Sequence, residues 1–105
     1  MAERVTHREF VGKVIGFSGL AIVDFYSDCC VPCKMILPAL TALEDQFREK
    51  LYVAKVNVAY EKELVEEYGI KVTPTILLIK NGRVVDRFSG VKKREELEQI
   101  VKSNL

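Results

Sequence analysis

Three cysteines within five positions are the residues of this chain whose type and spacing could do chemistry. Cys29, Cys30 and Cys33 lie in the stretch DFYSDCCVPCK, residues 24–34. Their number is odd and all three are local, so they cannot form a disulfide framework that cross-links distant loops. A structural zinc site prefers four thiolate or imidazole ligands, and the single histidine, His7, is far away in the sequence. The spacing therefore favours a redox-active pair, Cys30 and Cys33, with Cys29 as an additional thiol.

The elements on either side of the cysteines would place them at an edge of a sheet. Residues 20–26, LAIVDFY, form a continuous apolar run typical of a strand buried on both faces. Residues 31–49 carry apolar side chains one or two turns apart, which predicts an amphipathic helix. Cys30 would then precede a helix whose free N–H groups and positive dipole end lower a thiol pKa, making it the attacking sulfur. Cys33 follows one turn later, where it could attack a mixed disulfide and release the product.

A charged residue inside the first apolar run is the second candidate for chemistry. Asp24 should be largely buried, which is unfavourable unless its carboxyl group is paired, neutral or functional. We expect burial to raise the pKa of Asp24 and to suit it for proton transfer with Cys33. Lys55 lies in the apolar run 51–58, LYVAKVNV, and is the expected partner of Asp24. The pair is interpreted either as a structural ion pair or as part of the site.

The remaining residues complete an α/β pattern. In chain order, the further predicted elements are a helix at 7–17, a strand at 51–58, a helix at 61–69, strands at 75–80 and 83–90, and a helix at 92–105. The dipeptide Asn81-Gly82 is a strong signal for a tight hairpin turn between the last two strands. The order (β)αβαβαββα predicts an α/β fold with a mixed central β-sheet and helices on both faces. We expect residues 1–105 to form a single domain.

Composition and charge exclude several classes of function. The chain is 49% hydrophobic and 30% charged, and its 16 basic and 15 acidic residues give a net charge of +1. That balance provides no electrostatic basis for binding nucleic acid or an anionic membrane surface. No apolar run approaches the roughly 20 residues that span a bilayer, and the N-terminal segment has no apolar stretch typical of a signal peptide. We therefore expect a cytoplasmic protein that binds neither nucleic acid nor membrane.

Pro74 lies directly before the first strand of the predicted hairpin, in the sequence VTPTI. A proline cannot donate a ladder hydrogen bond, and the bond before a proline tolerates the cis form. From the residues alone, an ordinary proline at the start of a strand is the favoured interpretation.

Over essentially its whole length the chain resembles the thioredoxin family. The resemblance rests on VDFY followed by C-x-P-C-K-M-I-x-P, then VAKVNV, YGIKVTPTILLIKNG and a terminal SG…L…I, in the family's order and spacing. It implies the thioredoxin fold, with Cys30 as the nucleophile and Cys33 as the resolving thiol. It also implies that Asp24 is a buried proton carrier with Lys55 beside it, and that Tyr26 is an aromatic residue under the active-site loop.

The same resemblance implies a binding edge for client proteins, meaning the disulfide-bearing proteins on which the chain acts. The Thr73-Pro74 bond would be cis and lie against the disulfide, and the Thr73 backbone would bind an extended client segment. The residues implied to contact clients are Val31, Pro32, Thr73, Pro74, Gly90 and Val91. The implied partners are disulfide-containing client proteins and a flavoprotein thioredoxin reductase linked to NADPH or ferredoxin. No cofactor and no metal are implied, and we expect a monomer.

Three positions depart from the family's pattern. Val31 stands where the family usually has glycine, which stiffens the loop, adds apolar surface and affects the redox potential. Cys29 replaces the family's tryptophan and is interpreted either as a reactive third thiol or as a small packed replacement. Ala59 stands where the family often has an aspartate that orients this tryptophan, so the two losses are consistent with each other.

The leading hypothesis is a redox carrier that acts as a general protein disulfide reductase and cycles between the Cys30-Cys33 dithiol and disulfide. One alternative is an oxidising or isomerising protein of the same fold, which a much higher redox potential would favour. A second is a binding module in which redox activity is incidental, so that partner binding would survive loss of both cysteines. A third is a zinc or iron–sulfur site that Cys29, Cys30 and Cys33 share with a second copy of the chain.

Overall fold

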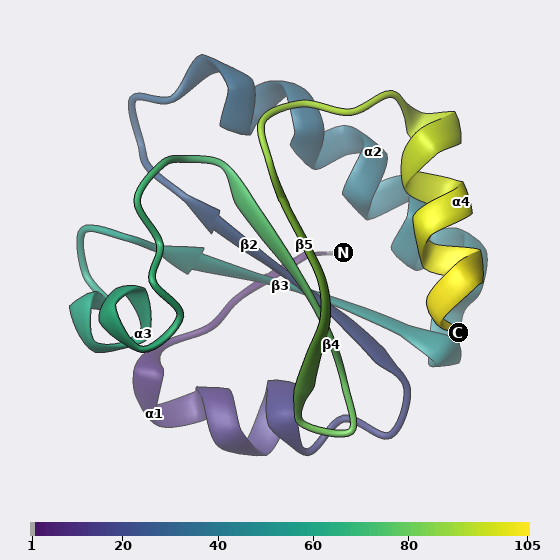
Figure 1. Cartoon of the computed structure of the whole chain (residues 1–105), viewed down its shortest axis with the longest axis horizontal. Coiled ribbons are helices and arrows are strands. Elements are labelled where there is room, and N and C mark those ends of the chain that lie inside the picture. The colour runs from purple at the N-terminus through teal and green to yellow at the C-terminus, as the bar shows by residue number, and fades with distance from the viewer. Residues whose placement is uncertain (1) are drawn as a thin grey trace.

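A five-stranded mixed sheet forms the centre of the computed structural model, which describes residues 2–105 (Figure 1). In chain order the strands are β1 (Glu3–Arg4), β2 (Leu20–Tyr26), β3 (Leu51–Asn57), β4 (Thr75–Lys80) and β5 (Arg83–Ser89). Their order across the sheet is β1-β3-β2-β4-β5. Strands β1, β2 and β3 are parallel, β4 is antiparallel to β2, and β5 is antiparallel to β4. The predicted mixed sheet is confirmed.

Helices cover both faces of this sheet, as the sequence pattern predicts. In chain order they are α1 (His7–Phe10), the π-helix Val11–Ile15, α2 (Val31–Phe47), the 3-10 turn Arg48–Lys50, α3 (Lys62–Glu67) and α4 (Arg94–Asn104). In Figure 1, α1 and α3 lie on one side of the sheet, and α2 and α4 lie on the other. Among residues 2–105, no helix has the length and hydropathy that crossing a bilayer requires.

The first helix differs from its prediction after its first turn. Thr6 is the N-cap, as expected, and its side chain accepts a hydrogen bond from the Glu9 N–H at 3.4 Å. The predicted single α-helix over residues 7–17 is wrong beyond Phe10, because the next turn is π-helical. The Gly16 N–H donates to the carbonyl of Val11, five residues back, at 2.9 Å. A widened turn of this kind has no clear signature in hydrophobic periodicity.

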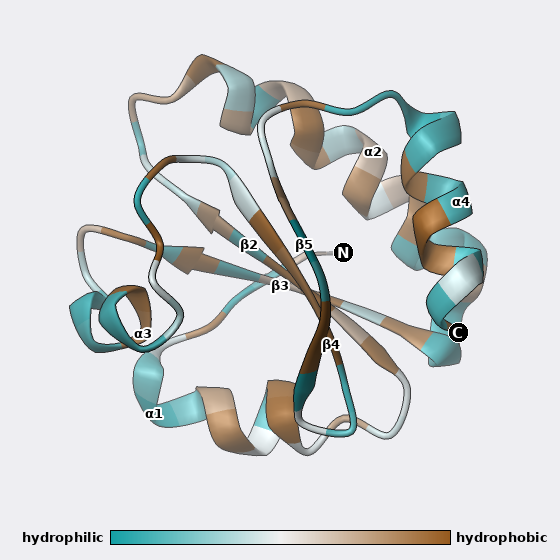
Figure 2. Cartoon of the chain, in the orientation of Figure 1, coloured by the Kyte–Doolittle hydropathy of each residue, from teal (hydrophilic) through white to brown (hydrophobic). Residues whose placement is uncertain are grey.

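Alternation along the strands divides the hydrophobic core into two layers. The layer under α1 and α3 contains Ala21, Val23 and Phe25 of β2, and the layer under α2 and α4 contains Leu20 and Ile22. Figure 2 colours much of β2, β3 and β4 as hydrophobic and much of α3 and α4 as hydrophilic. Because side chains alternate with a period of two, even-numbered residues of β2 face α2. Asp24 therefore lies on the α2 side of the sheet.

The strand directions bring four chain segments to one edge of the sheet. The carboxyl ends of β2 and β3 lie there, and β4 begins beside the end of β2 because Phe25 pairs with Thr75. The end of β5 lies at the same edge, since Ser89 also pairs with Thr75. The cysteines follow β2, so this edge is where residues far apart in the sequence can meet them.

Candidate active site

The two cysteines of the C-x-x-C pair lie at the start of α2. Cys30 is the N-cap of the helix, and Cys33 lies in its first turn. They form a disulfide with their Cα atoms 5.2 Å apart. The Cys30 sulfur accepts a hydrogen bond from the Cys33 N–H at 3.2 Å, so the sulfur faces the free N–H groups of the helix terminus. Such a donor stabilises a thiolate more than a thiol and lowers the thiol's pKa.

Both cysteines are largely buried as residues, with Cys30 8% exposed and Cys33 5% exposed. Pro32, between them, occupies the first turn of α2, where its missing N–H costs no helical hydrogen bond. The loop and the first turn of α2 thus place the largely buried pair at the edge of the sheet.

Asp24, on β2, is buried near the disulfide and is 1% exposed. It shares a cavity of about 170 Å³ with Cys33 and Lys55. Its Oδ1 has no hydrogen-bond partner among the described residues. Burial raises the pKa of Asp24 to about 7, and the positive charge of Lys55 opposes that rise. A carboxyl group that titrates near neutral pH can both accept and release a proton under physiological conditions.

Lys55 pairs with Asp24 in the register of β2 and β3 but does not form a direct ion pair with it. Its Nζ instead lies 5.4 Å from the centre of the Tyr26 ring. The half-buried lysine side chain thus turns toward the aromatic ring, and whether its pairing with Asp24 serves structure or chemistry stays a prediction. Lys55 still acts on Asp24 through its charge, across the shared cavity.

The Thr73-Pro74 peptide bond is cis, as the family resemblance implied. The interpretation from the residues alone, an ordinary proline at the start of a strand, did not predict this isomer. Pro74 is buried at the start of β4, and its carbonyl accepts a hydrogen bond from the Gly90 N–H at 3.0 Å. Thr73 is joined to Ser27, just after β2, by a 3.2 Å contact between their hydroxyl groups. Gly90 has a φ of +83°, a conformation that side-chain-bearing residues rarely adopt. These contacts bring the Thr73-Pro74 segment and Gly90 to the edge that carries the cysteines.

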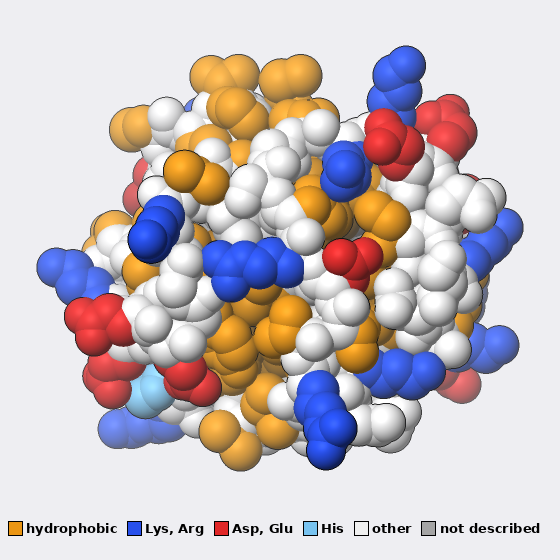
Figure 3. Space-filling view, viewed as in Figure 1, with side chains coloured by type: hydrophobic (Ala, Val, Ile, Leu, Met, Phe, Trp, Pro, Cys, Tyr) orange, Lys and Arg blue, Asp and Glu red, His pale blue; other side chains and the backbone are white. Residues whose placement is uncertain are grey.

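Apolar side chains are exposed around the disulfide. Val31 is 67% exposed and Met35 is 61% exposed on the first turns of α2, and Val91 is exposed beyond the end of β5. Figure 3 shows hydrophobic side chains gathered at the top of the molecule, over the start of α2. Exposed apolar side chains rimmed by polar residues are typical of protein–protein contact surfaces.

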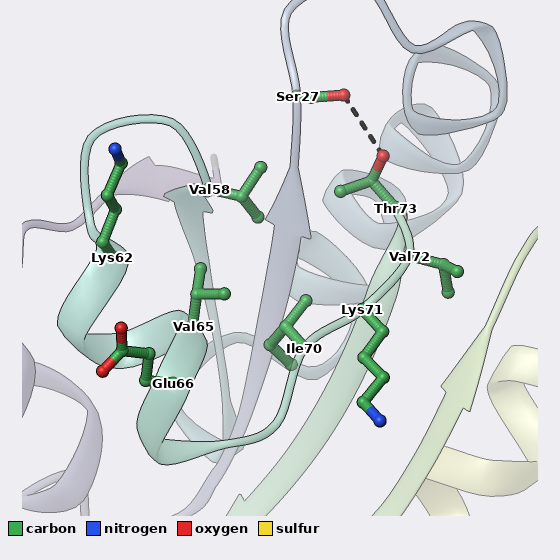
Figure 4. Close-up of a pocket in the computed structure, with 9 residues that line it drawn as sticks. All are labelled: Ser27, Val58, Lys62, Val65, Glu66, Ile70, Lys71, Val72 and Thr73. Carbon is green, nitrogen blue, oxygen red and sulfur yellow. Dashed lines mark hydrogen bonds between the residues drawn. The ribbon is translucent and has the colours of Figure 1, made fainter.

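A groove of about 690 Å³ lies beside this edge, between α3 and the segment that leads to Pro74 (Figure 4). Its lining residues are Ser27, Val58, Lys62, Val65, Glu66, Ile70, Lys71, Val72 and Thr73. The side chains of Val58, Val65 and Ile70 point toward one another, while those of Lys62 and Lys71 extend away (Figure 4). The Ser27–Thr73 contact closes one end of the groove near the cysteine loop.

Cys29 is a free thiol with an exposed side chain. The interpretation as a small packed replacement is therefore wrong, because Cys29 does not occupy the core. Ala59 is also exposed, so the position that the family's aspartate would fill faces solvent in this chain.

Two polar residues beside the cysteines escape the sequence analysis. Asn57, the last residue of β3, is 1% exposed, and its Nδ2 donates to Oδ1 of Asp28 at 3.1 Å. Asp28 lies in the loop between β2 and Cys30. Asn57 is a polar residue near the end of the apolar run 51–58, and that contrast is the sequence signal that could have indicated it.

Comparison with known proteins agrees with this geometry. The family model for thioredoxin matches residues 2–103. A thioredoxin of Bacillus subtilis is 37% identical over 83% of this chain and 84% of its own length. A thioredoxin of Rickettsia bellii is 30% identical over the full length of both chains. A mitochondrial thioredoxin of Mus musculus is 36% identical over 90% of this chain, which spans only 57% of that protein.

The fold and the cysteine site together define a thiol–disulfide oxidoreductase. The chain belongs to the thioredoxin family, and it has the thioredoxin fold.

Proposed function

We propose that the chain is a general protein disulfide reductase, in which Cys30 and Cys33 carry two electrons to client proteins. The observation that supports this most directly is the position of the Cys30 sulfur, which faces the Cys33 N–H at the start of α2. That position favours a thiolate, and the thiolate is the form that attacks disulfides.

The reaction begins with attack of the Cys30 thiolate on one sulfur of a client disulfide. A new bond joins Cys30 to that sulfur, and the other client sulfur leaves as a thiolate that takes a proton. Cys33 then loses its proton and attacks the Cys30 sulfur. This second step forms the Cys30–Cys33 disulfide and releases the client's remaining thiolate, so the client is reduced by two electrons and the protein is oxidised.

Asp24 is the proposed acceptor of the Cys33 proton. Both residues line the same cavity, and the raised pKa of Asp24, about 7, suits proton exchange at neutral pH. Lys55 lines that cavity too, and its charge helps to keep the Asp24 carboxylate accessible as a base.

Client proteins bind, in this proposal, across the edge around the disulfide. Val31, Pro32 and Val91 supply exposed surface, and the Thr73 backbone beside Pro74 binds an extended client segment. Gly90 leaves the edge open, since a Cβ atom added there would meet nothing within 4 Å.

The oxidised protein is returned to the dithiol by a flavoprotein thioredoxin reductase linked to NADPH or ferredoxin. Residues 1–105 act, in this proposal, as one monomeric unit in the cytoplasm, without a cofactor of their own. The mouse relative, by contrast, is named as mitochondrial.

Reduction of insulin disulfides by the dithiothreitol-recycled protein tests the proposal. Cys30→Ser should abolish the protein's contribution to the rate, because the attacking sulfur is lost. Cys33→Ser should accumulate a mixed disulfide between Cys30 and the client, visible by non-reducing electrophoresis. Cys29→Ser, the matched control, should stay within about twofold of wild type, because an exposed thiol outside the pair is not required. A Cys30→Ser protein that reduces insulin at the wild-type rate would show that the proposal is wrong.

A further inference from the structure

We propose that Asn57 and Asp28 form a loop clamp, a positioning contact between β3 and the loop 27–29 that holds Cys30 at the start of α2. The inference rests on the proposed function, because it concerns the same attacking sulfur. The clamp is the hydrogen bond from Asn57 Nδ2 to Asp28 Oδ1, 3.1 Å long.

Asn57 is fixed in place by more than this bond. Its side-chain Oδ1 accepts from the Ala59 N–H at 2.9 Å, and its backbone carbonyl accepts from the N–H groups of Tyr60 and Glu61. A buried amide without hydrogen-bond partners is unfavourable, so the side-chain orientation that satisfies both Oδ1 and Nδ2 of Asn57 is strongly favoured. Asn57 therefore presents a rigid N–H donor to the cysteine loop.

The loop that receives this donor leads directly to the nucleophile. β2 ends at Tyr26, whose carbonyl accepts from the Val58 N–H at 3.0 Å, and α2 begins after Cys30. Between them, Ser27 is held through Thr73, and Asp28 is held through Asn57. Asp28 lies two residues before Cys30, so the clamp holds the loop close to the sulfur that must face the helix terminus.

Asp28 has an exposed side chain and does not contact the reacting sulfurs, so its effect would act through the position of Cys30. Without the clamp, the loop samples more conformations, and the Cys30 sulfur spends less time against the Cys33 N–H. The Cys30 thiolate then loses stabilisation, which raises its pKa and slows its attack.

The negative charge of Asp28 could also change the pKa of groups in the site. The test must therefore separate the effect of this charge from the effect of the hydrogen bond. Asp28 lines the cavity that also contains Asp24, Lys34 and Lys55. Asp28→Asn removes the charge but retains an oxygen that accepts the Asn57 hydrogen bond. Asp28→Ala removes both the charge and the acceptor.

Two measurements test the clamp in a reduced Cys29→Ser background. The first is the rate of insulin reduction at pH 7. The second is the pH profile of Cys30 alkylation by iodoacetamide, with the modified cysteine located by fragmentation mass spectrometry. This profile needs no client, so it remains informative even if the protein reduces no protein disulfide.

Asp28→Ala should slow insulin reduction by about threefold to tenfold, the loss expected for one net hydrogen bond, and should move the alkylation profile to higher pH. Asp28→Asn should keep the wild-type profile and stay within about twofold of the wild-type rate. Asp45→Ala, which removes an exposed carboxylate near the far end of α2, is the matched control and should match wild type.

Two outcomes would overturn the loop clamp. An Asp28→Ala protein with the wild-type alkylation profile would show that the contact does not position Cys30. An Asp28→Asn protein that is impaired as much as Asp28→Ala would show that the charge, and not the hydrogen bond, is what matters. A wild-type protein that alkylates as expected but reduces no insulin would instead contradict the proposed function.

Discussion

The burial of Asp24 lowers the stability of the folded protein, and the same residue is the proposed acceptor of the Cys33 proton. Its carboxyl group is buried, and one of its oxygens lacks a hydrogen-bond partner among the described residues. Its pKa rises from an ordinary value of 3.8 to about 7 because burial disfavours the charged form. The folded protein therefore holds the Asp24 proton more tightly than the unfolded chain does.

This difference makes stability depend on pH with a definite sign. As the pH rises from about 4 to about 7, the unfolded chain loses the Asp24 proton while the folded protein keeps it, so the folded state becomes less stable. Each unit of pKa difference is worth about 1.4 kcal/mol, so the ionised carboxylate costs roughly 4 kcal/mol above pH 7.

Asp24→Asn should remove that cost. We expect the oxidised variant to gain unfolding free energy over wild type, with a gain roughly 3 kcal/mol larger at pH 8 than at pH 4.5. Guanidinium unfolding of both proteins at the two pH values measures this difference. Asp45→Asn, at an exposed position, should show no such dependence; an equal gain for Asp24→Asn at both pH values would contradict the raised pKa.

At the residue scale, the sequence could predict the side chains whose type is unusual for their place. A C-x-x-C pair before a helix and an aspartate inside an apolar run are both conspicuous, so the sequence indicates Cys30, Cys33 and Asp24 as candidates. The orientation of Lys55 toward Tyr26 could not be predicted, because a long side chain has many rotamers and its choice depends on the neighbouring strand. The sequence did not indicate Asn57, because the feature that singles it out is a hydrogen bond to Asp28, in a segment far away in the sequence.

At the scale of elements, the guanidinium group of Arg87 holds the end of α3, from which the chain continues to the cis Thr73-Pro74 bond. Arg87 of β5 donates to the carbonyls of Tyr68 and Gly69, at 2.5 and 2.9 Å, where α3 ends. Tyr68 also packs against the rings of Phe10 and Phe25. The end of α3 is thus held by an edge strand on one side and by the aromatic core on the other.

Arg87→Ala should destabilise the protein by about 1 kcal/mol and loosen the segment that leads to Pro74, because two carbonyls lose a charged donor. Hydrogen exchange should show reduced protection in residues 68–73. Arg83→Ala, at an exposed position on the same strand, should change neither quantity measurably. Unchanged protection in Arg87→Ala would mean that the aromatic contacts alone hold this segment.

Most elements follow from local sequence patterns, and the exceptions have identifiable causes. The hairpin forms where Asn81-Gly82 predicts it, with φ values of 53° and 79° that suit a two-residue turn between twisted strands. The first strand has only two residues, Glu3 and Arg4, and its hydrogen bonds to β3 leave no periodic pattern to detect. The cis bond at Pro74 depends on tertiary packing, so the residues alone favoured the commoner isomer.

At the scale of the whole molecule, the fold gathers the site from five segments. The ends of β2, β3 and β5 and the starts of α2 and β4 meet at one sheet edge. The two-layered core on either side fixes these segments relative to one another. The chemistry therefore depends on a rigid sheet that presents the disulfide at its edge, and the central claim concerns which thiols take part.

A redox-buffer titration with differential alkylation of all three cysteines tests that claim most directly. We expect Cys30 and Cys33 to oxidise together as one two-electron couple while Cys29 stays free to react. Their midpoint should lie nearer to about −270 mV than to the roughly −120 mV of a strongly oxidising protein dithiol. A disulfide that includes Cys29, or a strongly oxidising midpoint, would contradict a reductase built on Cys30 and Cys33.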